Sequence, residues 1–442
     1  MMAAQSGGLV SRRAGALSGV AEAPGDKSIS HRALIFGALA RGRSRITGLL
    51  EGDDVLRTAA AMRALGAEVE RSGGVWSVDG KPWRASGQAL YFGNSGTGAR
   101  LVMGAVAGAG VAATFDGDAS LRARPMGRVL EPLRMMGVNA ESNDGRLPVR
   151  IAAGGTLAAV KCVLAKPSAQ VKSAILLAAL GADGDTRIHE PVLCRDHTER
   201  MLAAFGADMI IEEDGEGGRF MSIAGGQKLT PSDIDVPGDP SSAAFLTAAA
   251  VITPGSDVIV KNVLVNPLRS GFYETLREMG GDIAFENRRE ENGEPVADIR
   301  ARHSILHGVE TPAARAPSMI DEYPILSVVA SFANGETMMR GLEELRVKES
   351  DRIASVEAGL AACGVDVASG EDWLRVRGQG KPPEGGARVK TNHDHRIAMS
   401  FLTMGCASNE PVEIDDASMI ATSFPDFFQI MTMLGGEIIA RS

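Results

Sequence analysis

The chain has 442 residues and a formal net charge of −9, from 46 Lys and Arg against 55 Asp and Glu. A chain of this length usually forms two or three domains. Its acidity and its aromatic share of only 4% argue against a phosphate-backbone binder and against a stacking platform for single-stranded nucleic acid. The four cysteines show no CxxC spacing, so the sequence predicts neither a disulfide framework nor a zinc site.

No segment of the sequence predicts a membrane span. The longest near-continuous apolar run, residues 101–113, falls short of the roughly 18 residues that a spanning helix needs. The first residues are basic and contain serine but lack an uninterrupted apolar stretch, so we interpret them as a terminal tail and not as a transit peptide. We therefore expect a cytoplasmic protein.

In chain order, one pattern recurs six times: a polar, turn-prone segment opens an apolar, alanine-rich helix. The six copies begin at Gly25, Gly93, Lys166, Gly238, Ile320 and His393. Because these helices are apolar nearly all round, we expect them to be buried. Lys27 and Ser28 resemble the end of a phosphate-binding P-loop, but Asp26 stands where that motif requires glycine. A plain helix N-cap is the competing interpretation of Ser28.

A second pattern alternates with the first and also occurs six times. It consists of an apolar helix end, a glycine and a short strand of alternating polarity, and its glycines are Gly66, Gly137, Gly206, Gly280, Gly364 and Gly435. Glycine adopts the left-handed conformation after a helix end at little cost. With the strand and charged loop between the two patterns, each unit spans about 70 residues. We predict an α/β fold of six units in two lobes, with a crossing near Val236–Ser242.

The openings of the buried helices are candidate anion sites. A helix N-terminus offers unsatisfied N–H groups and a partial positive charge. The openings carry Lys27, Ser28, Arg32, Asn94, Arg100, Ser168, Gln170 and Arg396, and the charged loops add Arg124, Arg195, Lys348 and Arg352. If the units stack in one orientation, we expect these groups to form a local positive site in an acidic protein.

Several shorter motifs allow two interpretations. Gly93–Gly98 has its glycines in the wrong order for a dinucleotide fingerprint. Residues 393–395, His-Asp-His, have the chemistry of metal ligands, but capping of the sixth helix by Asp394 is favoured. Residues 195–197 form either a surface ion network or part of a site, and the charged run 346–352 is either a solvated face or a functional loop. Three cysteines are expected in or near the core: Cys194, Cys363 and Cys406.

Nine of these motifs together resemble one family over essentially the whole chain. They are GDKSISHR, GNSGTGAR, RPMG, KPSAQVKSA, RDHTE, GDPSS, IDEYPIL, LRVKESDR and DHRIAMSF. In this order they resemble the 5-enolpyruvylshikimate-3-phosphate (EPSP) synthases, in a bacterial branch distinct from the enterobacterial and plant one. The resemblance implies transfer of the enolpyruvyl group of phosphoenolpyruvate to the 5-hydroxyl of shikimate 3-phosphate, in the shikimate pathway to aromatic amino acids, with no cofactor and no metal.

The family fold consists of two lobes, each of three βαβαββ-type units. By resemblance, residues 22–239 form a lobe that lies mainly on the shikimate 3-phosphate side. Residues 1–21 and 240–442 form a second, discontinuous lobe, and the active site lies in the cleft between the lobes. The resemblance also implies a monomer.

The resemblance assigns roles to individual residues. Those matching shikimate 3-phosphate contacts are Lys27, Ser28, Arg32, Ser168, Ala169, Gln170, Arg195, Asp321 and Lys348. Those matching phosphoenolpyruvate contacts are Lys27, Gly96, Arg124, Gln170, Arg352 and Arg396, with Asn94, Arg100 and Asp394 in support. The candidate catalytic residues are Asp321 near the hydroxyl, Glu349 near the methylene carbon and Lys27 between the reacting atoms.

Two departures and three alternatives accompany the resemblance. Thr422 aligns where better-known members carry lysine, and Arg195 stands where another branch has a different residue. Gly96 leaves room beside phosphoenolpyruvate, which implies competitive inhibition by glyphosate. A UDP-N-acetylglucosamine enolpyruvyl transferase would carry a reactive cysteine in the loop Gly117–Pro125, which has none. An RNA 3′-phosphate cyclase is disfavoured by charge, and a non-catalytic anion-binding relative by the presence of the acids and Lys27.

Overall fold

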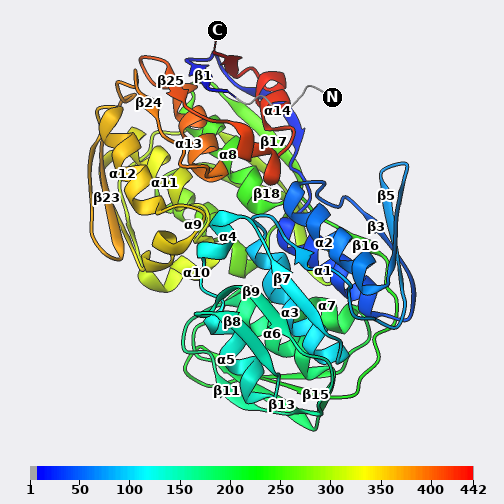
Figure 1. The fold of residues 1–442 in the computed structure, drawn as a ribbon. Helices are drawn as coiled ribbons and strands as arrows, with labels where there is room; N and C mark the ends of the chain where they lie inside the picture. The colour runs from blue at the N-terminus through cyan, green and yellow to red at the C-terminus, as the bar shows by residue number, and fades with distance from the viewer. Residues whose placement is uncertain (1–6, 442) are drawn as a thin grey trace. The chain divides into compact units, whose positions relative to one another are not determined.

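The computed structural model describes residues 7–441, and within them the chain divides into two compact units. Unit 1 comprises the described residues up to Pro24, Pro237–Glu290 and the chain from Pro295 onward. Unit 2 comprises Gly25–Val236 together with Glu291–Glu294. Both units alternate helices with small sheets (Figure 1), which confirms the predicted α/β fold class. Residues 1–6 and 442 of the predicted second lobe lie outside the described residues.

The six predicted apolar helices are all present and almost wholly buried. They are α1 (Lys27–Leu39), α3 (Gly96–Ala109), α6 (Ala169–Ala179), α8 (Pro240–Ile252), α11 (Tyr323–Phe332) and α13 (His395–Gly405). The side chain of Asp26 caps α1, because its Oδ1 accepts a hydrogen bond from the Ile29 amide at 2.8 Å. The competing interpretation of Ser28 as the N-cap is therefore wrong, and Ser28 lies in the first turn.

A second set of helices follows the charged loops. It consists of α2 (Asp53–Leu65), α5 (Gly127–Met135), α7 (His197–Ala204), α9 (Gly271–Glu278), α12 (Arg352–Ala362) and α14 (Phe427–Met433). Two short helices, α4 (Ala119–Ala123) and α10 (Ala316–Met319), complete the helices of the described chain. All six predicted glycines after the second helices have positive φ, between 78° and 112°, the region that favours glycine.

Unit 2 holds three four-stranded sheets and one two-stranded sheet among its described residues. The first orders β16 (Ile234–Asp235), β3 (Gly42–Thr47), β5 (Val75–Gly80) and β4 (Glu68–Ser72). The second orders β6 (Leu90–Tyr91), β7 (Ala113–Asp116), β9 (Arg146–Ile151) and β8 (Ala140–Asn143). The third orders β11 (Lys161–Val163), β13 (Asp185–Glu190), β15 (Arg219–Ala224) and β14 (Met209–Glu213), and the two-stranded sheet pairs β10 (Leu157–Ala158) with β12 (Ala182–Asp183).

Unit 1 holds three further four-stranded sheets among its described residues. The first orders β18 (Asp282–Glu291), β19 (Glu294–Arg302), β17 (Asp257–Leu264) and β2 (Ser18–Glu22). The second orders β20 (Glu310–Thr311), β21 (Asn334–Arg340), β23 (Trp373–Gln379) and β22 (Asp366–Ser369). The third orders β24 (Arg388–Val389), β25 (Val412–Ile414), β1 (Leu9–Arg12) and β26 (Glu437–Ala440). The N-terminal strands thus complete two sheets formed by the second half of the chain.

The four-stranded sheets share one topology, with an exchange of strands at the two unit boundaries. In four of them, the edge strand before a buried helix pairs in parallel with the strand after it, as β6 does with β7 around α3. The strand before α1, β2, instead pairs with β17, and the strand before α8, β16, pairs with β3. Each of these two strands therefore completes a repeat that belongs to the other half of the sequence.

Close helix packing explains one glycine pair of the sequence. Helices α3 and α6 lie side by side in unit 2 (Figure 1). A Cβ added at Gly104 would lie 2.2 Å from the carbonyl oxygen of Ala174, and one added at Gly108 would lie 2.5 Å from that of Leu177. Only glycine permits this approach of two backbones. Among the described residues, no helix has both the length and the apolar character that crossing a membrane requires.

Candidate active site

The starts of the three buried helices of unit 2 are tied together by side-chain hydrogen bonds. Arg100 of α3 donates to Gln170 Oε1 of α6 at 2.9 Å, and Gln170 Nε2 donates to Thr97 Oγ1 at 2.8 Å. His31 of α1 lies 3.5 Å from Ser95, the N-cap of α3. The predicted gathering of helix N-termini therefore holds within unit 2, where it presents amides and cations together.

Lys27 and Ser28 open α1 beside an acidic partner that the sequence analysis did not identify. The Lys27 ammonium lies 3.2 Å from the Asp54 carboxylate, which belongs to the first turn of α2. The backbone carbonyl of Ser28 accepts a hydrogen bond from Arg32 at 2.9 Å. The sequence could have indicated Asp54, because it lies in the charged loop and helix start that recur in each of the six repeats.

Among the described residues, the buried guanidinium of Arg32 hydrogen-bonds only to neutral groups. Its guanidinium donates to Thr198 Oγ1 and to Ser173 Oγ, each at 2.8 Å, and to the Ser28 carbonyl. Within residues 7–441, no carboxylate lies at ion-pairing distance from it. Burial, partly offset by more distant carboxylates such as Glu199, lowers the pKa of Arg32 to about 10. A buried guanidinium without a direct counterion favours an anionic ligand.

The N-terminus of α3 brings two guanidinium groups to Gly96. Arg124 hydrogen-bonds to the Asn94 side chain and to Ser120 Oγ, the latter at 3.3 Å. A Cβ added at Gly96 would lie 2.7 Å from Arg100 Nη1 and 3.3 Å from Arg124 Nη1. The absence of a Cβ at Gly96 therefore lets both guanidinium groups approach the start of α3, where cations and helix amides together suit a phosphate or carboxylate.

Ser168, Ala169 and Arg195 lie in the third repeat of unit 2. Ser168 is the N-cap of α6 and accepts from the Val171 amide at 3.4 Å, and Ala169 is the first helical residue. Arg195 is half-buried in the loop between β13 and α7. Its neighbours Asp196 and His197 are buried, so the interpretation of residues 195–197 as a surface ion network is wrong.

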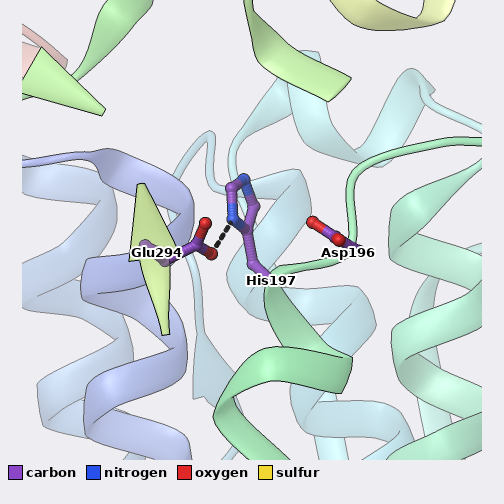
Figure 2. Close-up of side chains that lie close together, drawn as sticks. All are labelled: Asp196, His197 and Glu294. Atoms are coloured by element: carbon purple, nitrogen blue, oxygen red, sulfur yellow. Dashed lines mark hydrogen bonds and ion pairs between the residues drawn. The ribbon is translucent and has the colours of Figure 1, made fainter. Parts of the chain in front are cut away.

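Asp196, His197 and Glu294 form a buried cluster (Figure 2). Each offers one atom that could bind a metal ion, and these atoms all lie within 4.8 Å of one another. His197 Nδ1 lies 2.7 Å from Glu294 Oε1. The guanidinium of Arg200 lies 3.0 Å from Asp196 and 3.6 Å from Glu294, so a side-chain cation already pairs with both carboxylates. This donor set therefore fits an internal ion network better than a metal centre.

In unit 1, Arg352 lies at the centre of three carboxylates. Its Nε is 2.8 Å from Asp394, its Nη2 is 2.7 Å from Glu349 and its Nη1 is 3.1 Å from Asp321. Burial alone would lower the pKa of Arg352, but Asp394, Glu349 and Asp321 raise it above its ordinary value. The charged run 346–352 is therefore not a solvated face, since its last residue is buried.

Two further cations adjoin this cluster. Lys348 Nζ lies 3.9 Å from Asp321 Oδ1, and Arg396 Nη2 lies 3.9 Å from Asp321 Oδ2. Asp394 is the N-cap of α13, as predicted, because its Oδ1 accepts from the Arg396 amide at 2.9 Å. The cluster of Asp321, Glu349, Asp394, Lys348, Arg352 and Arg396 thus combines acids and cations at the starts of α12 and α13.

Thr422 ends a 3₁₀ turn of unit 1. Its hydroxyl donates to the carbonyl of Met419 at 2.6 Å, which is a local contact.

All four cysteines are free, and Cys194, Cys363 and Cys406 are buried as expected, whereas Cys162 is half-buried.

Comparison with known proteins decides the family. The model of EPSP synthase (3-phosphoshikimate 1-carboxyvinyltransferase) matches residues 12–431. The chain belongs to the EPSP synthase family. A Phenylobacterium zucineum protein named 3-phosphoshikimate 1-carboxyvinyltransferase is 57% identical over 433 residues, covering 97% of this chain and 95% of that protein. A Cereibacter sphaeroides protein of the same name is 56% identical, covering 98% of both chains.

Solved structures of the family agree with this assignment. An EPSP synthase structure from Acinetobacter baumannii superposes with a TM-score of 0.87 at 41% identity, covering 99% of this chain and all of that one. A second structure of the Acinetobacter baumannii enzyme gives a TM-score of 0.86 at 40% identity. The family therefore extends across both units, and no large part of the chain lies outside it.

Proposed function

We propose that this chain is a 3-phosphoshikimate 1-carboxyvinyltransferase, which moves the enolpyruvyl group of phosphoenolpyruvate to the 5-hydroxyl of shikimate 3-phosphate and releases phosphate. The observation that carries the proposal is the cluster around Arg352, where two candidate proton-transfer acids, Asp321 and Glu349, contact the same cation. Its relatives of more than 50% identity carry the name of this activity.

The residues of unit 2 would hold mainly shikimate 3-phosphate. Arg32 supplies a buried positive charge that has no direct carboxylate partner in the described part of the chain. Helices α1 and α6 supply N-termini at Lys27 and Ser168. Ser28, Ala169, Gln170 and Arg195 complete this proposed set. Gly96, Arg124 and Gln170, supported by Asn94 and Arg100, would hold phosphoenolpyruvate together with Lys27.

The charge of the substrates matches the charge of these residues. Each substrate carries one carboxylate and one phosphate of about −1.5 to −2, so roughly five negative charges must be bound together. The proposed cations are Lys27, Arg32, Arg100, Arg124, Arg195, Lys348, Arg352 and Arg396. Arg32 and Arg352 are buried, which strengthens their interaction with an anion because water screens it less.

The proposed reaction is an addition followed by an elimination. Glu349 protonates the methylene carbon of phosphoenolpyruvate, and the cationic centre that develops at C2 is stabilised by nearby carboxylates. Asp321 takes the proton of the 5-hydroxyl as its oxygen bonds to C2, which gives a tetrahedral adduct. The Glu349 carboxylate then takes one proton back from the new methyl group as the C2–O bond to phosphate breaks, which forms the enol ether, and the proton on Asp321 passes to the released phosphate. In this proposal Lys27 is the cation that contacts the reacting atoms.

Phosphate release tests this proposal. The wild-type protein should release phosphate with phosphoenolpyruvate plus shikimate 3-phosphate and not with UDP-N-acetylglucosamine as the acceptor. Asp321→Asn and Glu349→Gln should each lower kcat by about 10²–10⁴-fold with a small change in KM, because general acid–base catalysis contributes that much. Turnover with the nucleotide sugar alone would replace the proposal with a UDP-N-acetylglucosamine enolpyruvyl transferase.

One observation separates the two transferases. The loop Gly117–Pro125 contains α4, and Arg124 follows as its C-cap, with no cysteine in the loop. A non-catalytic anion-binding relative would bind both substrates and release no phosphate, and the presence of both acids and Lys27 argues against it.

The proposal also covers inhibition, oligomeric state and cellular location. Glyphosate would compete with phosphoenolpyruvate beside Gly96, and the protein would act as a monomer in the cytoplasm. Light scattering coupled to gel filtration measures the mass in solution. A mass near twice 46.2 kDa would contradict the monomer.

A further inference from the structure

Four charged side chains, of which three are buried and Arg219 is partly exposed, form a closed network in the third repeat of unit 2. Lys172 of α6 lies 2.8 Å from Glu190 Oε1 at the end of β13 and 2.7 Å from Glu199 Oε1 of α7. Arg219 of β15 lies 2.7 Å from Glu190 Oε2 and 2.9 Å from Glu199 Oε1. Two cations therefore neutralise two carboxylates, and we call these four residues the quartet.

The quartet is costly to bury, which implies a role beyond packing. The Lys172 side chain is fully inaccessible to solvent, and so is that of Glu190. Replacing such a network with apolar side chains is often neutral or stabilising, so a buried network is weak evidence of a stability role. Burial alone would lower the pKa of Lys172, but Glu199 and Glu190 raise it, so the lysine stays charged.

The quartet also holds the backbone of the loop that carries Arg195. Lys172 Nζ donates to the carbonyl oxygen of Cys194 at 3.2 Å. Glu190 Oε1 accepts from the Cys194 amide at 3.1 Å and from its thiol at 2.8 Å. Both backbone polar groups of the residue before Arg195 are thus fixed by buried charges. Charge-assisted hydrogen bonds of this kind are the stronger ones in proteins.

The same network adjoins the other proposed binding residues. Ser173 follows Lys172 and accepts a hydrogen bond from Arg32 at 2.8 Å. Thr198 precedes Glu199 and accepts from Arg32 Nε, also at 2.8 Å. One helical turn before Lys172, α6 begins at the proposed substrate residues Ser168 to Gln170. Two members of the quartet, Lys172 and Glu199, are therefore next in sequence to the two residues that bind Arg32.

We propose that Lys172 and Glu190 are positioning residues that fix the Arg195 loop for shikimate 3-phosphate. This inference rests on the proposed function of Arg195. Neither side chain is exposed to solvent, so each would act by holding Cys194 and, through the chain, Arg195. Because the loop is held from both the amide and the carbonyl of Cys194, loss of one charge releases one of the two restraints.

Steady-state kinetics of four variants tests the proposal. Lys172→Met should raise the KM for shikimate 3-phosphate about tenfold or more while the KM for phosphoenolpyruvate changes less than about twofold. Lys172→Arg should restore most of the affinity, since it keeps the charge. Lys161→Met is the matched control, because Lys161 is exposed on β11 of the same repeat. Glu190→Gln keeps the size of the side chain and carries the same test if Lys172→Met folds poorly.

A double variant separates positioning from general damage. If Lys172 acts through Arg195, adding Lys172→Met to Arg195→Ala should raise the KM for shikimate 3-phosphate little further, because coupled residues are not additive. Multiplying effects, an unchanged KM, or equal loss for both substrates would overturn the inference. Calorimetric titration of shikimate 3-phosphate gives the same readout without turnover. Failure of the proposed function would appear separately, as a wild-type protein that releases no phosphate.

Discussion

The Arg352 guanidinium and the Asp394 carboxylate form an ion pair of 2.8 Å in which both side chains are shielded from water, at 1% and 0% exposure. Asp394 also caps α13 by accepting from the Arg396 amide. One carboxylate therefore fixes two of the proposed phosphoenolpyruvate ligands, Arg352 through its side chain and Arg396 through its backbone.

The first prediction concerns the stability that this pair provides. Asp394→Ala leaves a buried guanidinium short of one counterion and removes a helix cap, so it should lower the free energy of unfolding by about 3–5 kcal/mol. The control is Asp366→Ala, since Asp366 pairs with Arg375 at 2.7 Å while half-exposed, and it should cost at most about 1 kcal/mol. Urea denaturation measures both. Equal effects would contradict the role of burial.

The second prediction is a pH dependence. Burial would raise the pKa of Asp394, but Arg352 lowers it below its ordinary value. Because the folded-state pKa is below the unfolded value of about 4, this contribution to stability is present above that pH and is lost as the pH falls through the folded-state pKa. The melting temperature should therefore drop more steeply between about pH 4 and pH 3 in the wild type than in Asp394→Asn. Parallel curves would exclude Asp394 as a source.

The third prediction concerns Gly96 and glyphosate. In Gly96→Ala the new methyl group would lie 2.7 Å from Arg100 Nη1, so that guanidinium must move. Glyphosate inhibition should weaken by at least about tenfold, with a rise in the KM for phosphoenolpyruvate, because both anions would use the cations beside Gly96. Gly127→Ala is the control, since its added Cβ would meet nothing closer than 3.8 Å. An unchanged inhibition constant would refute the steric explanation.

The fourth prediction separates binding from stability at Arg32. This guanidinium is buried against neutral partners, so Arg32→Met should keep or raise the melting temperature of the free protein. The same variant should lose most of the thermal stabilisation by shikimate 3-phosphate, which at saturation amounts to about 2.7 kcal/mol for 100-fold excess over Kd. Thermal shift with and without the substrate measures both quantities. A destabilised variant with a normal substrate shift would assign Arg32 a structural role.

The sequence alone determined the features that arise from local interactions. The six apolar helices follow from uninterrupted apolar composition, and the glycines after the second helices follow from the left-handed conformation that a helix end requires. Asp394 as the cap of α13 is local as well. The candidate site residues lie in motifs whose order along the chain matches a family. The motifs therefore identify these residues but not the groups that they contact.

The tertiary structure alone decided which of these residues are neighbours. The exchange of β2 and β16 and the pairing of Arg352 with Asp321 and Asp394 depend on contacts between segments far apart in sequence. The quartet is a further case: a lysine in an apolar helix required a buried counterion, but only folding selected Glu190 and Glu199. Hydrophobic pattern is read along one segment, whereas the pairing of buried charges depends on segments that only the folded chain brings together.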